Sequence, residues 1–419
     1  MIKENIFYEK EDRSLSIING DIDINNYFNN DIKSKTIEKN NLPTTWMNID
    51  LYQLEKNYKK ISKKVGYDVG IISVLKADAY GHGLLPIAKI LEKLKTDKIA
   101  IGSLDEAVVL RKNKIKTPII LLYPPLYDQF SMLLDLNVEI TISNYKSIAL
   151  LNKIAKDKNK IAKIHIQINT GLNRYGVNIN EALKLISNTS KLNFIKIESL
   201  WTHFTDAEDK KLTEIQFDNF LKILKEISLN KIKISSIHCA NSSSVINFKK
   251  SYNKKIFNDI LPGVKVFVRP GCLIYGTIQD KKGKLFNIPI ISSLVTHITD
   301  INYINKGETV GYFKKYLAKQ KLRIATIPVG WGNTGYLSEK AIVSLNNKYT
   351  NKIGLISSSN FAINITNIKK CDLGTRVFLI KNDDKKISLL RVSKDNNKFL
   401  NYFTSLLGSK IRKVYFKKL

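Results

Sequence analysis

The residue in this chain best suited to covalent chemistry is a lysine at the end of an apolar run. Lys76 follows residues 69–75 and precedes a turn that contains Gly81 and Gly83. A run so short and so apolar predicts a strand buried on both faces, extending over residues 69–77. A desolvated lysine amine forms an imine with an aldehyde cofactor. The alternative is an ordinary strand-end lysine whose ammonium extends to solvent.

Further polar residues lie at or after the ends of the predicted strands. In a closed parallel barrel the carboxyl ends of the strands share one rim, so these residues converge there. They are Tyr80 in the turn after Lys76, Arg174 after residues 163–170, His203 within 195–204, Ser242 after 232–240, and Arg269 within 266–271. Each alone has an ordinary explanation, such as a helix cap for the serine and a salt bridge or solvation for the arginines. Their shared position at strand ends predicts one site.

Alternating apolar runs and amphipathic segments predict the scaffold. The strand candidates are residues 69–77, 99–103, 118–123, 138–143, 163–170, 195–204, 232–240 and 266–271. The helical candidates are residues 84–94, 104–112, 145–156, 181–187 and 214–229, whereas 242–262 is less clearly helical. Eight such units predict an α/β, TIM-like (β/α)8 barrel. An open doubly wound sheet is the alternative, but no dinucleotide glycine fingerprint follows the first strand.

The helical period fades after about residue 288, which predicts a mostly β C-terminal domain. Its strand candidates are residues 294–298, 323–329, 353–357 and 376–380, and residues 45–51 form an N-terminal strand that pairs there. We therefore predict three parts: a polar and flexible arm over residues 1–44, a barrel over 45–287, and a β domain over 288–419.

Composition excludes several classes of protein. The chain has 419 residues and a formal net charge of +31. Its lysines are spread along the whole length beside abundant Asn and Ile, a pattern typical of AT-rich codon usage rather than of a nucleic-acid-binding patch. The basic segments at residues 410–413 and 416–418 are too short to indicate one. No apolar stretch is long enough to span a membrane.

The remaining features favour a cytoplasmic protein. Residues 1–41 lack the apolar core of a secretory signal. Cys239, Cys272 and Cys371 are widely spaced and odd in number, which fits reduced thiols and no metal site. His165 and His297 match no site pattern and are interpreted as structural.

Taken together, these residues resemble the alanine racemase family from about residue 45 to residue 415. Residues 74–83, Val-Leu-Lys-Ala-Asp-Ala-Tyr-Gly-His-Gly, match the lysine motif of that family closely. Further matches in the same order are residues 169–174, 201–204, 241–242, 268–276 and 306–312, with a looser match at 401–402 and 410–413. The resemblance implies a fold-type-III enzyme that uses pyridoxal 5'-phosphate, an amino-acid substrate, and a homodimer.

The resemblance implies two opposing bases, since racemisation removes a proton from one face of a carbon and returns it to the other. Lys76 would hold the cofactor and act as one base. Tyr312, contributed across the dimer interface, would act as the other, in a positive field from His203 and Arg269 that lowers its pKa. Arg269 would also face the pyridine nitrogen, where related decarboxylases carry a carboxylate instead.

The remaining implied contacts hold the phosphate and the substrate. The phosphate would be bound by Tyr80, Ser242, Gly271, Cys272 and Tyr402. Arg174 and the backbone of Ser358 would orient the substrate carboxylate. The implied activity is interconversion of L- and D-alanine, which supplies D-alanine for peptidoglycan. The alternatives are racemisation of another amino acid such as serine, or of several, a cofactor-binding protein with reduced activity, and, less favoured, a decarboxylase.

The chain departs from the family pattern at several positions. Gln167 replaces a lysine that positions the arginine seven residues on, although its amide still suits a hydrogen bond to Arg174. Trp331 and Gly332 replace a Tyr-Ala pair. Leu355 replaces an arginine, and Ser358 and Ser359 replace a Met-Asp pair. These changes predict a loosened substrate entrance, with lower activity or a side-chain preference other than methyl.

Overall fold

The computed structural model describes the backbone of residues 5–9 and 15–18 and, in full, residues 44–279, 283–335, 338 and 340–417. The chain divides into two compact units. The barrel unit contains residues 55–79 and 84–287, and the β unit contains residues 1–54, 80–83 and 288–419. Most of the predicted flexible arm lies outside the described residues, and the three-part division stays a prediction.

The barrel unit has, within its described residues, eight parallel strands that close on themselves through a pairing of β8 with β10. The strands are β4 (Gly70–Val74), β5 (Lys98–Ile101), β6 (Ile119–Leu121), β7 (Val138–Ile142), β8 (Ala162–Asn169), β10 (Ile195–Trp201), β11 (Ser236–Asn241) and β12 (Lys265–Arg269). A two-residue strand, β9 (Val177–Asn178), pairs with β8. The predicted TIM-like barrel is confirmed, and the open-sheet alternative is wrong.

Burial on both faces explains why the strands have continuous apolar sequences. All residues of β5, β6 and β7 are buried, since helices cover the outside of the barrel and side chains fill its interior. The exceptions to apolar character are polar residues buried in the strands, among them Lys98, Glu139, His165 and His238. These four side chains require hydrogen-bond partners inside the barrel.

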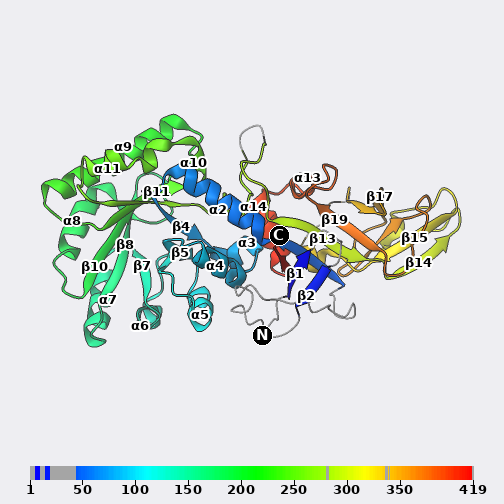
Figure 1. Cartoon of the computed structure of the whole chain (residues 1–419), viewed down its shortest axis with the longest axis horizontal. Coiled ribbons are helices and arrows are strands. Elements are labelled where there is room, and N and C mark those ends of the chain that lie inside the picture. Colours follow the sequence, from blue (N-terminus) through cyan, green and yellow to red (C-terminus); the bar gives the residue numbers. More distant parts are fainter. Residues whose placement is uncertain are drawn as a thin grey trace. The chain divides into compact units, whose positions relative to one another are not determined.

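Helices alternate with the strands along the barrel (Figure 1). They are α2 (Leu51–Val65, which begins in the β unit), α4 (Leu84–Lys93), α5 (Leu104–Lys112), α6 (Phe130–Asp135), α7 (Tyr145–Asp157), α8 (Ile179–Thr189), α9 (Lys210–Leu229), α10 (Ser242–Asn247) and α11 (Lys254–Asn258), with 3-10 turns η2 (Tyr127–Gln129) and η3 (Lys249–Tyr252). Several begin at a capping side chain: Ser103, Asn144 and Asp209 accept backbone hydrogen bonds from the first turns of α5, α7 and α9.

The β unit is built on a sheet that has eleven described strands. In sheet order they are β14 (Asp300–Ile304), β15 (Leu322–Ile327), β18 (Phe361–Asn364), β17 (Lys348–Ile353), β16 (Ile342–Leu345), β19 (Arg376–Lys381), β13 (Ile291–His297), β3 (Thr45–Asp50), β20 (Arg412–Phe416), β1 (Asn5–Glu9) and β2 (Leu15–Ile18). The described helical segments are η4 (Tyr312–Lys314), α12 (Trp331–Thr334), α13 (Leu389–Asp395) and α14 (Leu400–Gly408).

The predicted mostly β domain is thereby confirmed. The expected N-terminal strand is β3, which pairs antiparallel with β13. One strand expectation was wrong: residues 353–357 are not a strand, because β17 ends at Ile353 and the chain turns at Gly354, where φ is +67°. This positive φ interrupts the extended backbone.

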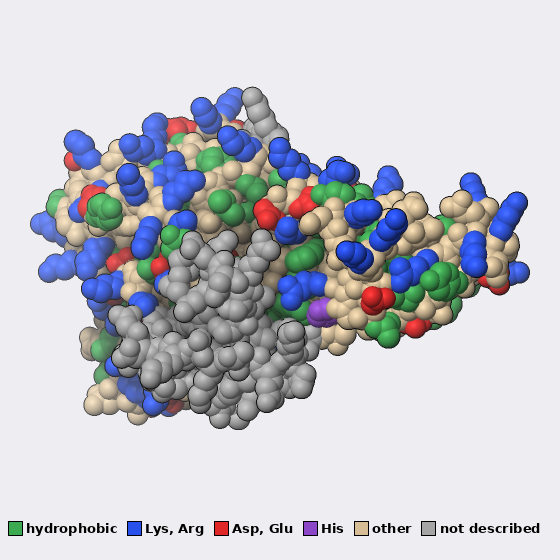
Figure 2. All heavy atoms as spheres, turned by 45° about the vertical axis from the view of Figure 1, so that its right-hand side comes forward, with side chains coloured by type: hydrophobic (Ala, Val, Ile, Leu, Met, Phe, Trp, Pro, Cys, Tyr) green, Lys and Arg blue, Asp and Glu red, His purple; other side chains and the backbone are tan. Residues whose placement is uncertain are grey.

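Basic side chains are scattered over the face of the molecule that Figure 2 shows, with fewer acidic ones between them. This distribution agrees with the interpretation that the net charge follows from composition. In the part of the chain that is described, we find no helix that is both long and apolar enough to cross a membrane.

Candidate active site

The barrel unit brings several sequence-predicted residues to the carboxyl ends of its strands. Strands of one parallel barrel end at the same rim, so side chains at these ends lie around one opening. Lys76 follows β4, Arg174 follows β8, His203 follows β10, Ser242 follows β11, Arg269 ends β12, and Gly271 and Cys272 come next. The site that the sequence predicts at this rim is therefore geometrically possible.

Lys76 opens an unusual left-handed turn. Strand β4 ends at Val74, three residues earlier than the predicted strand, and α3 (Lys76–Gly81) follows at once. From Ala77 to Tyr80 the φ angles are 56°, 53°, 54° and 54°, so this single turn is left-handed although none of the four residues is glycine. Each such residue costs roughly 1–2 kcal/mol relative to right-handed backbone. Strain of this kind persists only where surrounding contacts impose it, and it clusters at functional sites.

Partly buried hydrogen bonds support that conformation. The Glu106 carboxylate accepts hydrogen bonds from the backbone N–H of Asp78 at 3.0 Å and of Gly102 at 2.8 Å. The Asp78 carboxylate accepts one from the N–H of Leu84 at 2.7 Å. Desolvation by burial raises the pKa of Glu106, and these backbone donors oppose that rise. Glu106 thus links the turn after Lys76 to the end of the neighbouring strand, a role that the sequence analysis missed.

The left-handed turn leads to a stability prediction: an alanine-to-glycine substitution should stabilise the protein in this turn and destabilise it in an ordinary helix. We expect Ala77→Gly to raise the free energy of unfolding by up to about 1 kcal/mol, because glycine has no left-handed penalty at an exposed position. The matched control is Ala149→Gly, which is exposed in the right-handed helix α7 and is expected to cost about 1 kcal/mol. Denaturant unfolding measures both. Equal losses at the two sites would contradict a left-handed turn.

Arg269 is a buried cation held by neutral groups. Its side chain donates to the carbonyl oxygen of Thr202 at 2.9 Å and to Nδ1 of His238 at 2.8 Å, and its guanidinium lies 4.7 Å from the centre of the Trp201 ring. Among the described residues, no carboxylate forms an ion pair with it. Burial lowers the pKa of Arg269 to about 10, so the group stays charged at neutral pH. An unneutralised buried cation is costly and suits an anionic or electron-rich ligand.

His203 lies beside this cation and is neutral. Its Nδ1 is 3.4 Å from a guanidinium nitrogen of Arg269, and its Nε2 is 3.3 Å from the amide nitrogen of Asn241. Desolvation by burial, followed by the positive charges of Arg269, Arg174 and Lys76, lowers the pKa of His203 well below its usual value. Any positive field in this site therefore comes from Arg269, Arg174 and Lys76 rather than from a charged His203, which revises the expectation that His203 supplies it.

Buried histidines lead to a second stability prediction. Burial lowers the pKa values of His165, His203 and His238, so below about pH 6.5 the unfolded chain binds protons that the folded chain does not. We expect the free energy of unfolding to fall as the pH drops from about 6.5 towards 5, by at most about 1.4 kcal/mol per pH unit for each histidine. In His238→Asn, the asparagine amide oxygen takes the place of the Nδ1 acceptor. The unfolding free energy of this variant should change less steeply with pH, by the contribution of one histidine. A slope unchanged by that variant would contradict the assignment.

Ser242 is placed to donate a hydrogen bond. Its buried Oγ accepts the backbone N–H of Gly271 at 2.9 Å and of Leu273 at 3.3 Å. The hydroxyl keeps its own proton, for which the described residues show no acceptor. Asn241 caps the adjacent helix α10 by accepting the N–H of Ser244 at 3.0 Å. The structure thus brings the predicted Ser242 and Gly271 together.

Two aromatic rings that the sequence analysis missed line the same rim. The Lys76 amine lies 5.4 Å from the centre of the Tyr123 ring, and Tyr123 packs edge-to-face on Tyr175 with ring centres 6.1 Å apart. Arg174 is exposed; it stacks 4.8 Å from the centre of the Tyr175 ring and donates to its hydroxyl at 3.3 Å. Tyr123 ends a predicted strand, and that position was the available signal.

Gln167 does not take the role expected of it. It is 1% exposed, and its amide oxygen has no hydrogen-bond partner among the described residues. The hydrogen bond recorded for Arg174 goes to Tyr175. The predicted amide contact from Gln167 to Arg174 is therefore absent from the described structure.

Four other predicted residues belong to the β unit. Tyr80 is the last non-glycine residue with positive φ in α3. The side chains of Tyr312 and Tyr402 are 61% and 50% exposed, which leaves both phenols accessible within their own unit. Tyr312 begins η4, directly after Gly311 at φ +72°. Ser358 is also exposed.

The Ser358 loop explains one departure from the family pattern. The carbonyl oxygen of Ser358 accepts the N–H of Gly332 at 2.8 Å, and that of Ser357 accepts the N–H of Trp331 at 3.1 Å. A Cβ atom at Gly332 would lie 2.7 Å from the Ser358 carbonyl oxygen, and one at Gly330 would lie 2.3 Å from the Ser358 carbonyl carbon. Both positions require glycine for this close approach, so Gly332 belongs to the packing of the serine loop.

The fold and the rim together define a class of protein. A (β/α)8 barrel carries an amine and a buried unneutralised arginine at its rim, and a separate β unit carries exposed phenols. Charged and polar side chains at this rim of a (β/α)8 barrel are typical of an enzyme that binds a small molecule there.

The comparisons with known proteins give the family. Residues 49–279 match the model "Alanine racemase, N-terminal domain", and residues 291–415 match "Alanine racemase, C-terminal domain". An alanine racemase of Halothermothrix orenii is 33% identical over 343 residues, which cover 80% of this chain and 87% of that protein. The solved alanine racemase of Clostridium difficile 630 has a TM-score of 0.82 at 26% identity and covers 90% of this chain and 97% of its own. The chain belongs to the alanine racemase family.

One family structure is described with its cofactor. The alanine racemase of Bartonella henselae, with covalently bound pyridoxal phosphate, has a TM-score of 0.75 and 23% identity, and it covers 89% of this chain and 100% of its own. At this identity the likeness carries only the shared fold.

Proposed function

We propose that this chain is an alanine racemase that holds pyridoxal 5'-phosphate at the barrel rim and interconverts L- and D-alanine. The observation that carries the proposal is Lys76, an amine set in a strained left-handed turn at the end of β4, in a chain that belongs to the alanine racemase family. Backbone strain beside a reactive side chain is a common property of active sites.

The donor set at the rim fits this cofactor. The Lys76 amine can bond its aldehyde. The buried charge of Arg269, which has no ion-pair partner among the described residues, suits the ring nitrogen. A permanent guanidinium there donates a hydrogen bond and does not surrender a proton. The hydroxyl proton of Ser242 suits the phosphate, together with the neighbouring N–H group of Cys272 and the phenols of Tyr80 and Tyr402. The N–H of Gly271, which donates to Ser242 Oγ, holds that hydroxyl in place.

The proposed reaction is a proton exchange between two opposed bases. The bound cofactor delocalises the negative charge left when the α-proton departs. Lys76 removes or returns the proton on one face of the carbon, and Tyr312 does so on the other. Arg174 orients the substrate carboxylate, and the backbone of Ser358 supports it. Arg269 supplies the positive field that a tyrosine base requires, since His203 is neutral.

The proposed assembly is a homodimer in which Tyr312 serves the site of the partner subunit. Tyr312 is 61% exposed within its own chain, and its neighbour Phe313 is 84% exposed. Adjacent exposed aromatic side chains are typical of a surface that another chain covers. We further propose that the enzyme works in the cytoplasm and supplies D-alanine for peptidoglycan.

A second candidate function is racemisation of serine or of several amino acids. It is favoured by the loop at residues 357–359, where Ser358 and Ser359 replace a Met-Asp pair of the family pattern and are exposed. Short side chains leave more room for a substrate side chain than Met and Asp do.

The test is a chiral assay of purified protein supplied with pyridoxal phosphate and, separately, L-alanine, L-serine and other L-amino acids. Formation of D-alanine faster than any other D-amino acid supports the proposal. Faster formation of D-serine, or a broad profile, would favour the second candidate. Cofactor binding without any D-product would favour a binding protein, and release of carbon dioxide would favour a decarboxylase.

A further inference from the structure

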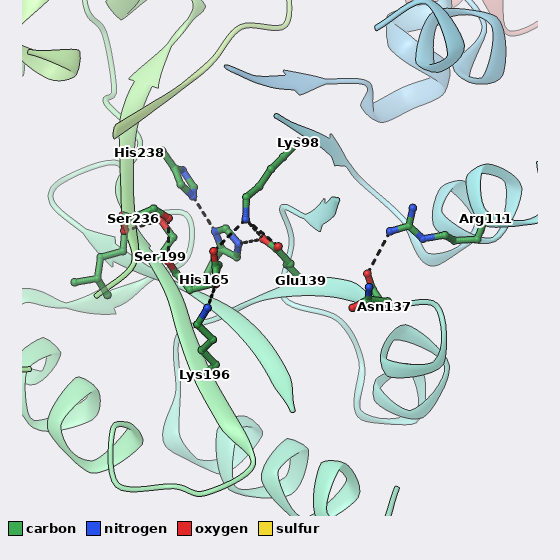
Figure 3. A network of polar contacts seen from close by, with 11 residues as sticks. Lys98, Arg111, Asn137, Glu139, His165, Lys196, Ser199, Ser236 and His238 are labelled. Atoms are coloured by element: carbon green, nitrogen blue, oxygen red, sulfur yellow. Dashed lines mark hydrogen bonds and ion pairs between the residues drawn. The ribbon is translucent and has the colours of Figure 1, made fainter. Parts of the chain in front are cut away.

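A chain of buried hydrogen bonds runs from Arg269 through the barrel interior to the opposite end of its strands. Figure 3 shows its part from His238 through His165 and Glu139 to Lys98. Arg269 lies 2.8 Å from Nδ1 of His238, and Nε2 of His238 lies 2.9 Å from Nδ1 of His165. Nε2 of His165 lies 2.7 Å from Oε2 of Glu139, which the Lys98 ammonium contacts at 2.6 Å. Lys98 is the first residue of β5, whereas Arg269 is the last residue of β12.

The hydrogen bonds between Arg269 and Glu139 can all be donated in one direction only, from Arg269 towards Glu139. A guanidinium has no acceptor, so Nδ1 of His238 accepts and Nε2 of the same ring carries the proton. Nδ1 of His165 must then accept, which places its proton on Nε2, directed at the Glu139 carboxylate. The carboxylate and the guanidinium are the two fixed ends, and together they leave each histidine one tautomer.

Burial and charge agree with this arrangement. Both histidines are buried, and desolvation lowers their pKa values, so each imidazole is neutral at neutral pH. Burial alone would raise the pKa of Glu139, but the hydrogen bonds from His165 and Lys98 and the charge of Lys98 hold it below its usual value. The carboxylate is therefore ionised and accepts only. The His238 ring also stacks on Trp201 at 5.3 Å between ring centres, which restricts its rotation.

We infer that Glu139 and His165 are positioning residues: they fix the tautomer of His238 and so hold the Arg269 guanidinium in place for the cofactor ring. The inference rests on the proposed function for the identity of the group that Arg269 faces. It gives the buried polar residues of the barrel strands a task beyond packing. His165, which the sequence analysis took to be merely structural, becomes a link to the active site.

The central test is Glu139→Gln. The Lys98 ammonium contacts both oxygens of Glu139, at 2.8 and 2.6 Å, and His165 contacts Oε2 alone. The amide has only one acceptor oxygen, so its nitrogen faces an N–H donor in either orientation. In the orientation with the amide nitrogen towards His165, both histidine tautomers reverse, and an N–H on Nδ1 of His238 meets the guanidinium of Arg269. We expect kcat to fall roughly tenfold to 100-fold, with KM for alanine nearly unchanged.

Two further variants separate positioning from general stability. Glu198→Gln is the matched control, because Glu198 contacts Lys98 at 3.4 Å but does not contact His165. It should leave the tautomers and kcat unchanged. Lys98→Met combined with Glu139→Gln removes the competing ammonium, so the amide oxygen accepts from His165 again. This double variant should recover most of kcat, which a purely structural loss would not do.

The tautomers are read by nitrogen NMR of protein labelled at its five histidines, without cofactor or substrate. We expect the proton on Nε2 in both His165 and His238 of the wild type, and on Nδ1 in Glu139→Gln. A proton on Nδ1 of His238 in the wild type would overturn the inference, as would reversed tautomers with wild-type kcat in Glu139→Gln. A wild type that racemises nothing would refute the proposed function instead, and the spectrum would still decide the hydrogen-bond direction.

Discussion

Lys76→Ala is expected to remove racemase activity almost completely, with a fall in kcat of roughly 10⁴-fold or more. The amine would both anchor the cofactor and exchange the substrate proton, and a positioned acid/base group alone contributes up to about 10⁴-fold. Loss of the covalent anchor should also abolish the absorbance of lysine-bound cofactor. A chiral assay and an absorbance spectrum of the purified variant measure the two effects separately.

The control for this variant is Lys112→Ala, a truncation of an exposed lysine in the last turn of α5. It should retain both activity and spectrum. Partial recovery of Lys76→Ala by a small added amine would show that the missing group is chemical rather than structural. Retention of more than about a hundredth of wild-type kcat would contradict a role as acid/base.

The barrel was predictable because its strands are buried on both faces. Each of the eight described barrel strands overlaps an apolar run that stands out in the sequence, from residues 69–77 to residues 266–271. Strand ends in a parallel barrel share one rim, so the site could be located without coordinates. Other elements were not found: the six-residue α6 and the 15-residue α2 were missed, and the run at 353–357 was mistaken for a strand.

The left-handed turn could not be predicted from local propensity. Positive φ is expected at glycine, and the sequence directed attention to Gly81 and Gly83. The structure extends it to four non-glycine residues, 77–80, which long-range hydrogen bonds from Glu106 help to hold. A carboxylate 28 residues away in the chain leaves no local signal beside Lys76.

The interior hydrogen-bond chain also could not be predicted from the sequence. Lys98, Glu139 and His165 come from three different strands, and only barrel closure brings their side chains together. Taken one strand at a time, each is an isolated polar residue in an apolar run. His165 was accordingly taken to be structural. The charge state of His203 depends in the same way on its burial beside Arg269. That burial cannot be predicted from the sequence alone.

Mixed dimers provide the sharpest test of the proposed cross-subunit base. One chain carries Lys76→Ala and the other carries Tyr312→Phe, and each homodimer is expected to be nearly inactive. If Tyr312 serves the partner subunit, one site of the heterodimer lacks both groups and the other keeps both. The purified heterodimer, isolated through two different affinity tags, should then have about half of the wild-type kcat per dimer.

The mirror-image heterodimer distinguishes this arrangement from a base supplied by the same chain. When one chain carries both substitutions and the other is wild type, the cross-subunit arrangement leaves each site without one of the two groups. That heterodimer should therefore be nearly inactive. If Tyr312 instead served its own chain, the two results would be exchanged: the doubly substituted heterodimer would keep about half of the activity, and the first would lose it. Since both heterodimers contain the same two substitutions, a general loss of folding or of dimerisation cannot imitate either pattern.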